Sequence, residues 1–372
     1  MSTSARAAVA VEALRTELQD FSLPEIGADD GLLQVEVAGV CGTDWEIYRR
    51  ESRGRGLGPL ILGHENIGRI VALGERAAER WGASVGDRVA VEEFLPCGHC
   101  RFCLSGRGWL CDKTDSRGAG PFLRYGSTPT TIPPALWGGF GEYLYLHPNS
   151  LIHRLSDDLP GEQAALFVPL SNGIRWVAEV GKGGPGGSIL VQGPGQHGLG
   201  CVVAAKAAGM ETVIVSGLSH SPYRLEVARA LGADLTIEAD REDVAARVRD
   251  ATGGRGADIV VDLAPGATET VEIAVDAAAK TGVVILAGSK HGRAVEGFSN
   301  DATVRKELTV RGVRGRDYAS VERALDLIAS RRFPLELMCT HTFGLSETDK
   351  ALRLVGERWD RAAIHVNVVP AP

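Results

Sequence analysis

The chain has 372 residues, which is too long for one ordinary hydrophobic core and predicts at least two domains. Hydrophobic residues make up 44% of it and charged residues 23%, the usual mix for a soluble globular protein. The formal net charge of −7 argues against a nucleic-acid partner, which would normally meet a basic surface. No apolar run approaches the roughly 20 residues of a membrane-spanning helix. Charges at Arg6, Glu12, Arg15 and Glu17 interrupt any signal-peptide core, so we expect a cytoplasmic protein without a membrane partner.

Short β-rich runs separated by Gly, Pro and Asp dominate the first 160 residues. The clearest runs are residues 32–40, 66–74 and 87–95. Residues 112–141 are rich in Gly, Pro and Thr and predict an extended loop. Its larger side chains are candidates for lining a substrate pocket; they are Arg124, Tyr125 and Trp137.

From about residue 162 the pattern changes to alternating strands and helices. Short apolar strands are predicted at residues 188–192, 212–216, 257–263 and 282–288. Helical spacing is found between them, at residues 199–209 and 224–233. This alternation, with continuously apolar strands, predicts a parallel sheet that is covered on both faces. Towards the C-terminus, residues 320–330 predict a helix and residues 362–370 a strand.

Four of the seven cysteines fall within 15 residues, at Cys97, Cys100, Cys103 and Cys111. In a reducing compartment such a cluster indicates metal binding rather than disulfides. Zinc takes four sulfur ligands tetrahedrally, and a closed set of cysteines leaves no position for a substrate, so the predicted site is structural. Four unrelated thiols and an iron–sulfur cluster remain as alternatives, although the short, even spacing within a β-rich region favours zinc.

A glycine-rich loop follows the strand at 188–192 and leads directly into a helix. Gly193, Gly195 and Gly198 form the pattern G-x-G-x-x-G. The first glycine permits a tight turn, the second lets the backbone approach a pyrophosphate, and the third lets helix and strand pack closely. The helix N-terminus offers free N–H groups to the phosphates. We therefore predict dinucleotide binding; an ordinary glycine turn is the alternative.

The strand at 212–216 would normally end at an acid that binds the adenosine ribose. Here Gly217 and Ser219 follow it, and Arg224 lies beyond. Without the repulsion of an acid, and with an arginine to pair with it, a 2′-phosphate is acceptable, which favours NADP and leaves NAD open. Alternatively, Arg224 only solvates the start of the following helix.

A second candidate metal site is more dispersed. Cys41 lies in the segment GVCGTD (39–44), and His64 and Glu65 lie in GHENIG (63–68). A cysteine, a histidine and a carboxylate from two segments can hold an open, catalytic zinc, although isolated Cys and His residues are usually structural.

In this order, along essentially the whole chain, these motifs resemble the zinc-containing medium-chain dehydrogenase/reductase family, near its sorbitol, threonine and glucose dehydrogenase-like branches. The late segment THTFGLSETDKAL (340–352) extends the resemblance. It implies an α/β protein with a GroES-like β-rich catalytic domain and a Rossmann cofactor domain with a doubly wound parallel sheet. We expect the first over residues 1–165, the second over 166–318, and a C-terminal return, 319–372, that completes the catalytic domain. The family also implies a homo-oligomer, a dimer or tetramer.

The resemblance assigns roles to individual residues. Cys41, His64 and Glu65 match the catalytic zinc ligands, and the four clustered cysteines match the structural zinc ligands. Thr43 matches the hydroxyl that links the substrate oxygen to a proton relay. Two positions depart from the family. Val168 replaces the third protein ligand and cannot coordinate, so Cys41, His64 and Glu65 would have to hold the metal. Glu46 stands where many relatives have a relay histidine, and is either a proton carrier or a solvated surface acid.

The function implied is that of a zinc-dependent alcohol dehydrogenase, which transfers a hydride between an alcohol or polyol, or its carbonyl counterpart, and NAD(P). Two alternatives stay open. One is a zinc-independent NADPH-dependent enone or quinone reductase of the same superfamily, favoured by Val168 and opposed by the retained Cys41, His64 and Glu65. The other is a non-catalytic nucleotide-binding protein.

Overall fold

The computed structural model describes residues 4–49, 58–115 and 120–370, and it divides into two compact units. The first unit combines residues 1–167 with 339–372, and the second comprises residues 168–338. The return to the first unit therefore begins later than the boundary predicted after residue 318. The reason is α11 (Tyr318–Ala329), which packs within the second unit. Its Ser320 donates a hydrogen bond to Glu179 at 3.3 Å, and its Arg323 forms an ion pair with the same carboxylate.

Two antiparallel-rich sheets build the first unit. The larger, among the described residues, is ordered β15 (Cys339–Gly344), β16 (His365–Val369), β3 (Gly31–Val40), β5 (Glu65–Leu73), β6 (Arg88–Val91) and β8 (Ile152–Arg154), with β7 (Tyr143–Leu146) also on β3. The smaller is ordered β2 (Arg15–Ser22), β1 (Ser4–Glu12) and β4 (Leu60–Ile61). The helices of this unit are α1 (Gly42–Tyr48), α2 (Glu75–Trp81), α3 (Arg101–Leu104), α4 (Gly161–Ala164) and α12 (Thr348–Glu357).

Strand β3 lies inside the larger sheet and contributes buried side chains to both faces, while Gln34 and Glu36 are exposed. Leu32, Ala38 and Val40 join one hydrophobic cluster, whereas Leu33 and Val35 join another. This is the alternation that a strand imposes, since successive side chains point to opposite faces. The run at 32–40, predicted from its β-rich composition, is confirmed as a strand, and its pairing on both sides fixes the position of the residues that follow it.

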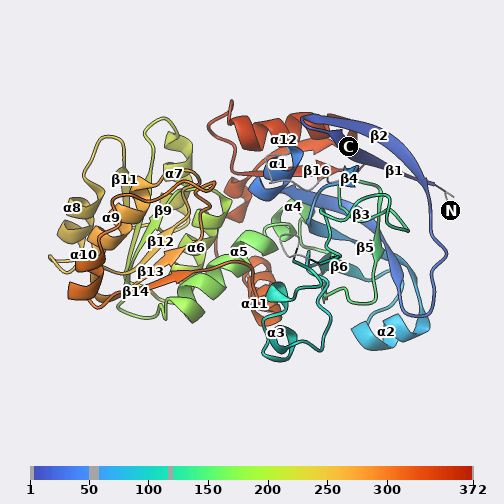
Figure 1. The fold of residues 1–372 in the computed structure, drawn as a ribbon, viewed down its shortest axis with the longest axis horizontal. Coiled ribbons are helices and arrows are strands. Elements are labelled where there is room, and N and C mark those ends of the chain that lie inside the picture. Colours follow the sequence, from blue (N-terminus) through green and yellow to red (C-terminus); the bar gives the residue numbers. More distant parts are fainter. Residues whose placement is uncertain (1–3, 50–57, 116–119, 371–372) are drawn as a thin grey trace. The chain divides into compact units, whose positions relative to one another are not determined.

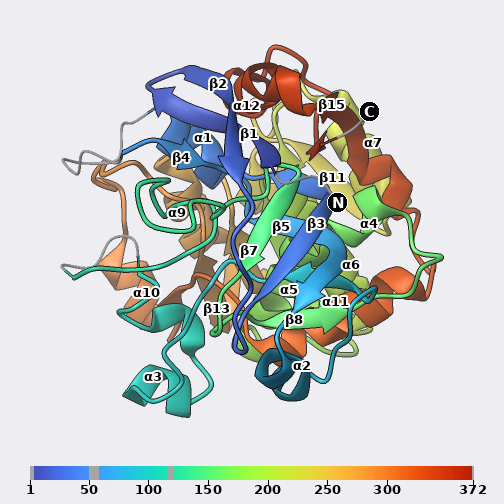
Figure 2. The same ribbon diagram turned by 90° about the vertical axis from the view of Figure 1, so that its right-hand side faces the viewer.

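The C-terminal segment returns to this sheet. β16 pairs antiparallel with β3, with Val366 opposite Val40, and it pairs in parallel with β15. Figure 1 shows the red β16 beside the blue β3, although more than 300 residues of sequence separate them. Figure 2 gives the same sheet from another side, with β3, β5, β7 and β8 towards the viewer. The return brings His365 to the strand that leads into Cys41.

The second unit is a parallel sheet with helices between its strands. Its order is β11 (Leu235–Glu238), β10 (Thr212–Gly217), β9 (Ser188–Gln192), β12 (Ala257–Asp262), β13 (Ala278–Leu286) and β14 (Thr309–Gly312). The helices are α5 (Phe167–Ile174), which begins at the unit boundary, a π-helix (Arg175–Val180), α6 (Gln196–Ala207), α7 (Pro222–Ala230), α8 (Val244–Ala251), α9 (Glu269–Ala277), α10 (Asn300–Arg305) and α11.

This strand order is that of the doubly wound dinucleotide-binding fold, and the predicted fold class is confirmed. The four predicted strands are the four inner ones, each of which contains a run of buried apolar residues. The edge strands β11 and β14 were not predicted, because each has four residues and is only partly buried. In the part of the chain that the structure describes, no helix is long and apolar enough to cross a membrane.

Candidate metal and cofactor sites

The four clustered cysteines lie together in a short lobe, residues 97–111. Their sulfur atoms all fall within 4.8 Å of one another. The sulfurs of Cys100 and Cys103 are 3.5 Å apart, and those of Cys97 and Cys103 are 4.0 Å apart. A tetrahedral zinc with bonds of about 2.3 Å to sulfur requires sulfur–sulfur separations of about 3.8 Å, whereas a disulfide requires about 2 Å. The separations thus fit a zinc site.

Backbone donors help to ionise this lobe. A hydrogen bond from the His99 backbone lowers the pKa of Cys97 to about 6. The backbone N–H of Cys97 in turn donates to the sulfur of Cys111 at 3.4 Å. Burial raises the pKa of Cys103 to about 12, and a bound metal would favour the loss of this proton because zinc takes thiolates as ligands.

Cys41 and Thr43 lie where β3 passes into α1. Cys41 is the N-cap of that helix, and its backbone N–H donates to Oδ2 of Asp44 at 2.9 Å. Its buried thiol donates to the Thr43 hydroxyl at 3.8 Å. The fixed helix start therefore holds a thiol and a hydroxyl side by side.

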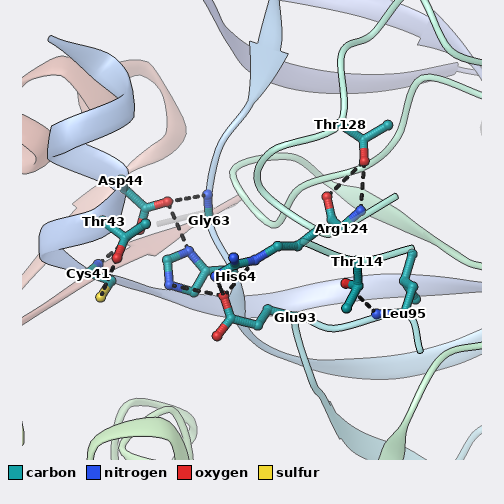
Figure 3. Close-up of polar contacts among 10 residues, drawn as sticks. All are labelled: Cys41, Thr43, Asp44, Gly63, His64, Glu93, Leu95, Thr114, Arg124 and Thr128. Carbon is teal, nitrogen blue, oxygen red and sulfur yellow. Dashed lines mark hydrogen bonds and ion pairs between the residues drawn. The ribbon is translucent and has the colours of Figure 1, made fainter. Parts of the chain in front are cut away.

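His64 is buried between two carboxylates (Figure 3). Its Nδ1 lies 3.1 Å from Oδ1 of Asp44, and its Nε2 lies 3.9 Å from Oε2 of Glu93. Burial lowers the pKa of His64, but the two carboxylates outweigh it and hold the pKa well above its usual value. Arg124 donates to Glu93 from Nε at 3.1 Å and closes the cluster. With Nδ1 held by Asp44, Nε2 is the nitrogen that a metal would use.

Glu65 meets His365 across the middle strand. Both side chains are fully buried, and Oε2 of Glu65 is 3.8 Å from Nδ1 of His365. Gly39 lies between them: a Cβ there would be 2.3 Å from Oε2 of Glu65 and 2.7 Å from Cε1 of His365. The missing side chain makes room for the pair.

The structure therefore brings the three candidate catalytic ligands to one region of the first unit, but the distances between their ligand atoms differ. The sulfur of Cys41 and a carboxylate oxygen of Glu65 lie within 4.8 Å of one another. Cys41 also contacts the imidazole of His64. Among the described residues, the ring nitrogens of His64 do not form a group with Cys41 and Glu65 in which all ligand atoms lie within 4.8 Å of one another. The His64 ring is instead held between Asp44 and Glu93. The donor set of thiolate, imidazole and carboxylate suits zinc.

Glu46 and Val168, the two positions that depart from the family pattern, are a partly exposed acid and a buried apolar residue in the structure. Glu46 lies one turn beyond Thr43 on α1, is partly exposed and forms an ion pair with Arg49 at 2.9 Å. Val168 is the second residue of α5 and is buried. Its side chain is apolar and offers no ligand.

The glycine loop has the backbone that each glycine was predicted to provide. Gly193 has a φ of +100°, in a region that favours glycine. Gly195 is the N-cap of α6, and a Cβ there would meet nothing within 4 Å, so the backbone is open to a ligand. At Gly198 a Cβ would lie 2.0 Å from the carbonyl oxygen of Gly193, which only glycine avoids. The loop and the N-terminus of α6 fit a pyrophosphate.

Beyond β10 the structure places an acid that the sequence did not point to. Gly217 ends β10, and Arg224 lies half-buried in the first turn of α7. Ser219 donates to Asp240 from its backbone N–H at 2.7 Å and from its hydroxyl at 2.6 Å. Asp240 follows the next strand, β11, so a carboxylate does stand beside the residues that were predicted to accept a 2′-phosphate.

Two of the predicted pocket residues belong to the core. Tyr125 is fully buried and hydrogen-bonded to Ser150 and to the carbonyl of Tyr145. Trp137 is buried at the same place and donates to the carbonyl of Ile132 at 2.8 Å. Large aromatic side chains in a Gly/Pro-rich loop look like ligand contacts in a sequence, but here they anchor the loop to the sheet.

Sequence reasoning missed four supporting side chains: Asp44, Glu93, His365 and Asp240. Asp44 carried a local signal, since an acid three residues after an N-cap is a capping pattern. The other three come into place only through pairing of strands or loops that are distant in the sequence.

Comparison with known proteins agrees with this architecture. Residues 27–157 match the model of the alcohol dehydrogenase GroES-like domain, and residues 198–330 match that of the zinc-binding dehydrogenase domain. The chain is 40% identical over 368 residues to a Mycobacterium tuberculosis protein named "Probable alcohol dehydrogenase adh", covering 98% of both chains. It is 32% identical over 369 residues to the erythritol/L-threitol dehydrogenase of Mycolicibacterium smegmatis, covering 95% of this chain and 94% of that protein.

The solved structures include an alcohol dehydrogenase from Thermotoga maritima that superposes with a TM-score of 0.87 at 26% identity, over 99% of this chain and 100% of that one. With two domain models matched in tandem and a relative matched along its length, the chain belongs to the zinc-containing medium-chain dehydrogenase/reductase family and is an oxidoreductase.

Proposed function

We propose that the protein oxidises an alcohol or polyol to its carbonyl compound with a nicotinamide cofactor, and catalyses the reverse reaction. In the forward direction the carbinol carbon gives up its hydrogen as a hydride to the nicotinamide, and the hydroxyl group gives up its proton. The observation that carries this is the convergence of the buried Cys41 and Glu65 with the half-buried Thr43 around the end of β3. The names of the relatives, which include alcohol and erythritol/L-threitol dehydrogenases, support this substrate class.

Cys41, His64 and Glu65 would hold a catalytic zinc ion. When bound, such an ion supplies Lewis-acid chemistry at the substrate oxygen. Asp44 fixes the orientation of the His64 ring through Nδ1, and the Cys41 thiol is held at the helix start. The four clustered cysteines would hold a second, structural zinc that takes no part in the reaction.

The first turn of α1 offers a route for the proton. The Thr43 hydroxyl would take up the proton of the substrate hydroxyl group while it passes its own proton on, so that it stays neutral. Glu46 lies three residues further, on the same face of the helix, and reaches solvent. Its carboxylate would pass the proton outward.

The rival reaction is the zinc-independent reduction of enones or quinones. It is favoured by Val168, which is buried and apolar at the position of the third ligand. It leaves the buried polar groups of Cys41, His64 and Glu65 without a role. The rival therefore predicts that the protein turns over with the structural zinc alone.

The test is an alcohol and polyol panel, followed by absorbance of the reduced nicotinamide, on the wild type and on Cys41→Ser. We expect turnover of at least one alcohol by the wild type and a loss of at least about 100-fold in Cys41→Ser, because a ligand is removed. Zinc content should fall from two ions per chain to one. Cys339→Ser, which alters a half-buried thiol hydrogen-bonded to the Glu162 carbonyl, is the matched control. Full turnover by Cys41→Ser with one zinc would establish the rival.

Three finer points are also proposals. The absence of an acid at Gly217 and Ser219, with Arg224 beyond, favours NADP, whereas Asp240 argues for NAD. None of the seven cysteines, all of which lie in described parts of the chain, forms a disulfide, which supports a reducing compartment such as the cytoplasm. Membership of the family supports a homo-oligomer, a dimer or tetramer.

A further inference from the structure

The end of β10 adjoins the glycine loop at the edge of the sheet where nucleotides bind. The backbone N–H of Gly193 donates to the carbonyl of Ser216 at 2.9 Å. A Cβ on Gly217 would lie 2.7 Å from the ring of Pro194, in the same loop. On the other side, the backbone N–H of Ala239 donates to the carbonyl of Gly217 at 2.8 Å. The residues after β10 and after β11 therefore stand together beside the predicted pyrophosphate site.

Asp240 is the charged group at this edge. Each of its carboxylate oxygens accepts one hydrogen bond from Ser219, from the hydroxyl at 2.6 Å and from the backbone N–H at 2.7 Å. These bonds lower the pKa of Asp240, which is exposed and therefore ionised at neutral pH. A carboxylate oxygen has two acceptor positions, so each oxygen can take one further donor.

We propose that Asp240 is a specificity-determining residue, and that it makes this dehydrogenase prefer NAD to NADP. The inference rests on the proposed function, since it assumes that a nicotinamide dinucleotide binds at the glycine loop. A ribose 2′-hydroxyl can donate to the remaining acceptor positions of Asp240. A 2′-phosphate has no proton to donate there, is repelled by the carboxylate, and finds both donors of Ser219 already engaged.

The carboxylate thus performs, from the end of β11, the role that an acid at the end of β10 performs in other dinucleotide-binding folds. This explains how the chain can have glycine and serine at the expected position and still discriminate. It also changes the substitution that tests the choice. Gly217→Asp would be the obvious variant from the sequence, but its Cβ would collide with Pro194. Asp240 can be altered without such strain.

The experiment measures the dissociation constants of NAD+ and NADP+ by calorimetric titration of the full chain. The wild type should bind NAD+ more tightly. Asp240→Asn keeps an oxygen for the Ser219 backbone but removes the charge. We expect it to tighten NADP+ binding by about ten-fold, which is about 1.4 kcal/mol, with NAD+ changed by less than about three-fold. Asp250→Asn, which removes an exposed charge on α8 of the same unit, should change neither constant.

The possible outcomes distinguish the proposed role of Asp240 from the proposed dehydrogenase function. A wild type that prefers NADP+, or an unchanged ratio in Asp240→Asn, overturns the role of Asp240 while the proposed function stands. Equal weakening of both nucleotides would show a merely structural role and overturns it too. Ser219→Ala is a second variant that leaves Asp240 only the backbone donor, and it should reduce the preference by a smaller factor. If the wild type binds neither nucleotide, the proposed function itself fails.

Discussion

Gly39 shows how a single residue sets the geometry of the candidate catalytic site. It is paired with Glu65 on one side and with Asn367 on the other, so it lies in the middle strand of three. Glu65 and His365 meet in the space above it, and both are buried. Any side chain at residue 39 must displace a buried carboxylate and a buried imidazole.

We therefore predict that Gly39→Ala destabilises the protein by about 1–3 kcal/mol, the usual cost of overpacking a buried site. It should also weaken the retention of the catalytic zinc, because Glu65 is pushed from its position. Thermal unfolding and zinc content after dialysis measure the two effects. Gly42→Ala is the matched control, since a Cβ at that exposed residue would meet nothing within 4 Å. Equal behaviour of the two variants would show that the space at Gly39 has no such role.

At the scale of single residues, a site could be predicted from the sequence when its residues lie close together in the chain. The cysteines of the lobe and the glycines of the loop are each separated by a few residues, so their spacing reveals their chemistry. Cys41 and His64 needed the resemblance to a family, because each is isolated in the sequence. His365 and Asp240 have no pattern of their own. They are placed by β16 pairing with β3, and by β11 ending beside β10.

Among the elements, the loops that follow β12 and β13 are joined by a buried ion pair. The ammonium group of Lys290 lies 2.7 Å from Oδ2 of Asp262, the last residue of β12. It also donates to the carbonyl of Ala264 at 2.7 Å and to the hydroxyl of Thr270 at 3.0 Å. The Leu263–Ala264 backbone lies against Gly193 of the glycine loop, so this ion pair orders the surroundings of the nucleotide site.

Lys290→Met should destabilise the protein by about 3–5 kcal/mol, because it leaves the fully buried Asp262 charged and without its cation. Urea unfolding measures the change. Arg249→Met removes an exposed pair with Asp276 in the same unit and should cost less than about 1 kcal/mol. Adding Asp262→Asn to Lys290→Met should recover part of the loss. If Lys290→Met and Arg249→Met lower the free energy of unfolding by similar amounts, the buried pair stabilises the protein no more than the exposed one.

The prediction of elements succeeded where burial made the pattern strong. Each of the four inner strands of the second unit contains a run of buried apolar residues, and all four were predicted, although β13 begins four residues before the predicted start at residue 282. The boundary at residue 318 failed because the helical pattern of α11 says nothing about which unit it packs against. That is decided by Glu179, whose contacts with Ser320 and Arg323 hold α11 to the second unit. The pocket role of Trp137 failed for a similar reason, since its partners lie on strand β7 and the residues after it.

On the scale of the whole molecule, the two candidate zinc sites are built in opposite ways. The lobe takes four thiols from one segment of 15 residues, and no other residue that the structure describes joins this group. The catalytic set takes Cys41 from the start of α1 and His64 and Glu65 from the start of β5, with His365 of β16 behind them. We therefore expect the lobe to depend on metal for its own structure, whereas the catalytic ligands lie on or beside strands that are held by backbone pairing.

This difference predicts unequal loss of zinc under a mild chelator. One zinc should leave early, together with activity, because only three protein ligands hold it and one of them is a carboxylate. The fold should persist at that stage, and added zinc should restore turnover, since Cys41 and Glu65 remain in a rigid frame. The second zinc should leave only under stronger chelation, with a fall in melting temperature as the lobe loses its structure.

Zinc content, turnover and circular dichroism are to be followed in the same samples over time. Loss of both ions together with unfolding would contradict the independence of the two sites. Undiminished turnover after the first zinc has left would show that the reaction does not use metal, and the enone-reductase function would then replace the one proposed.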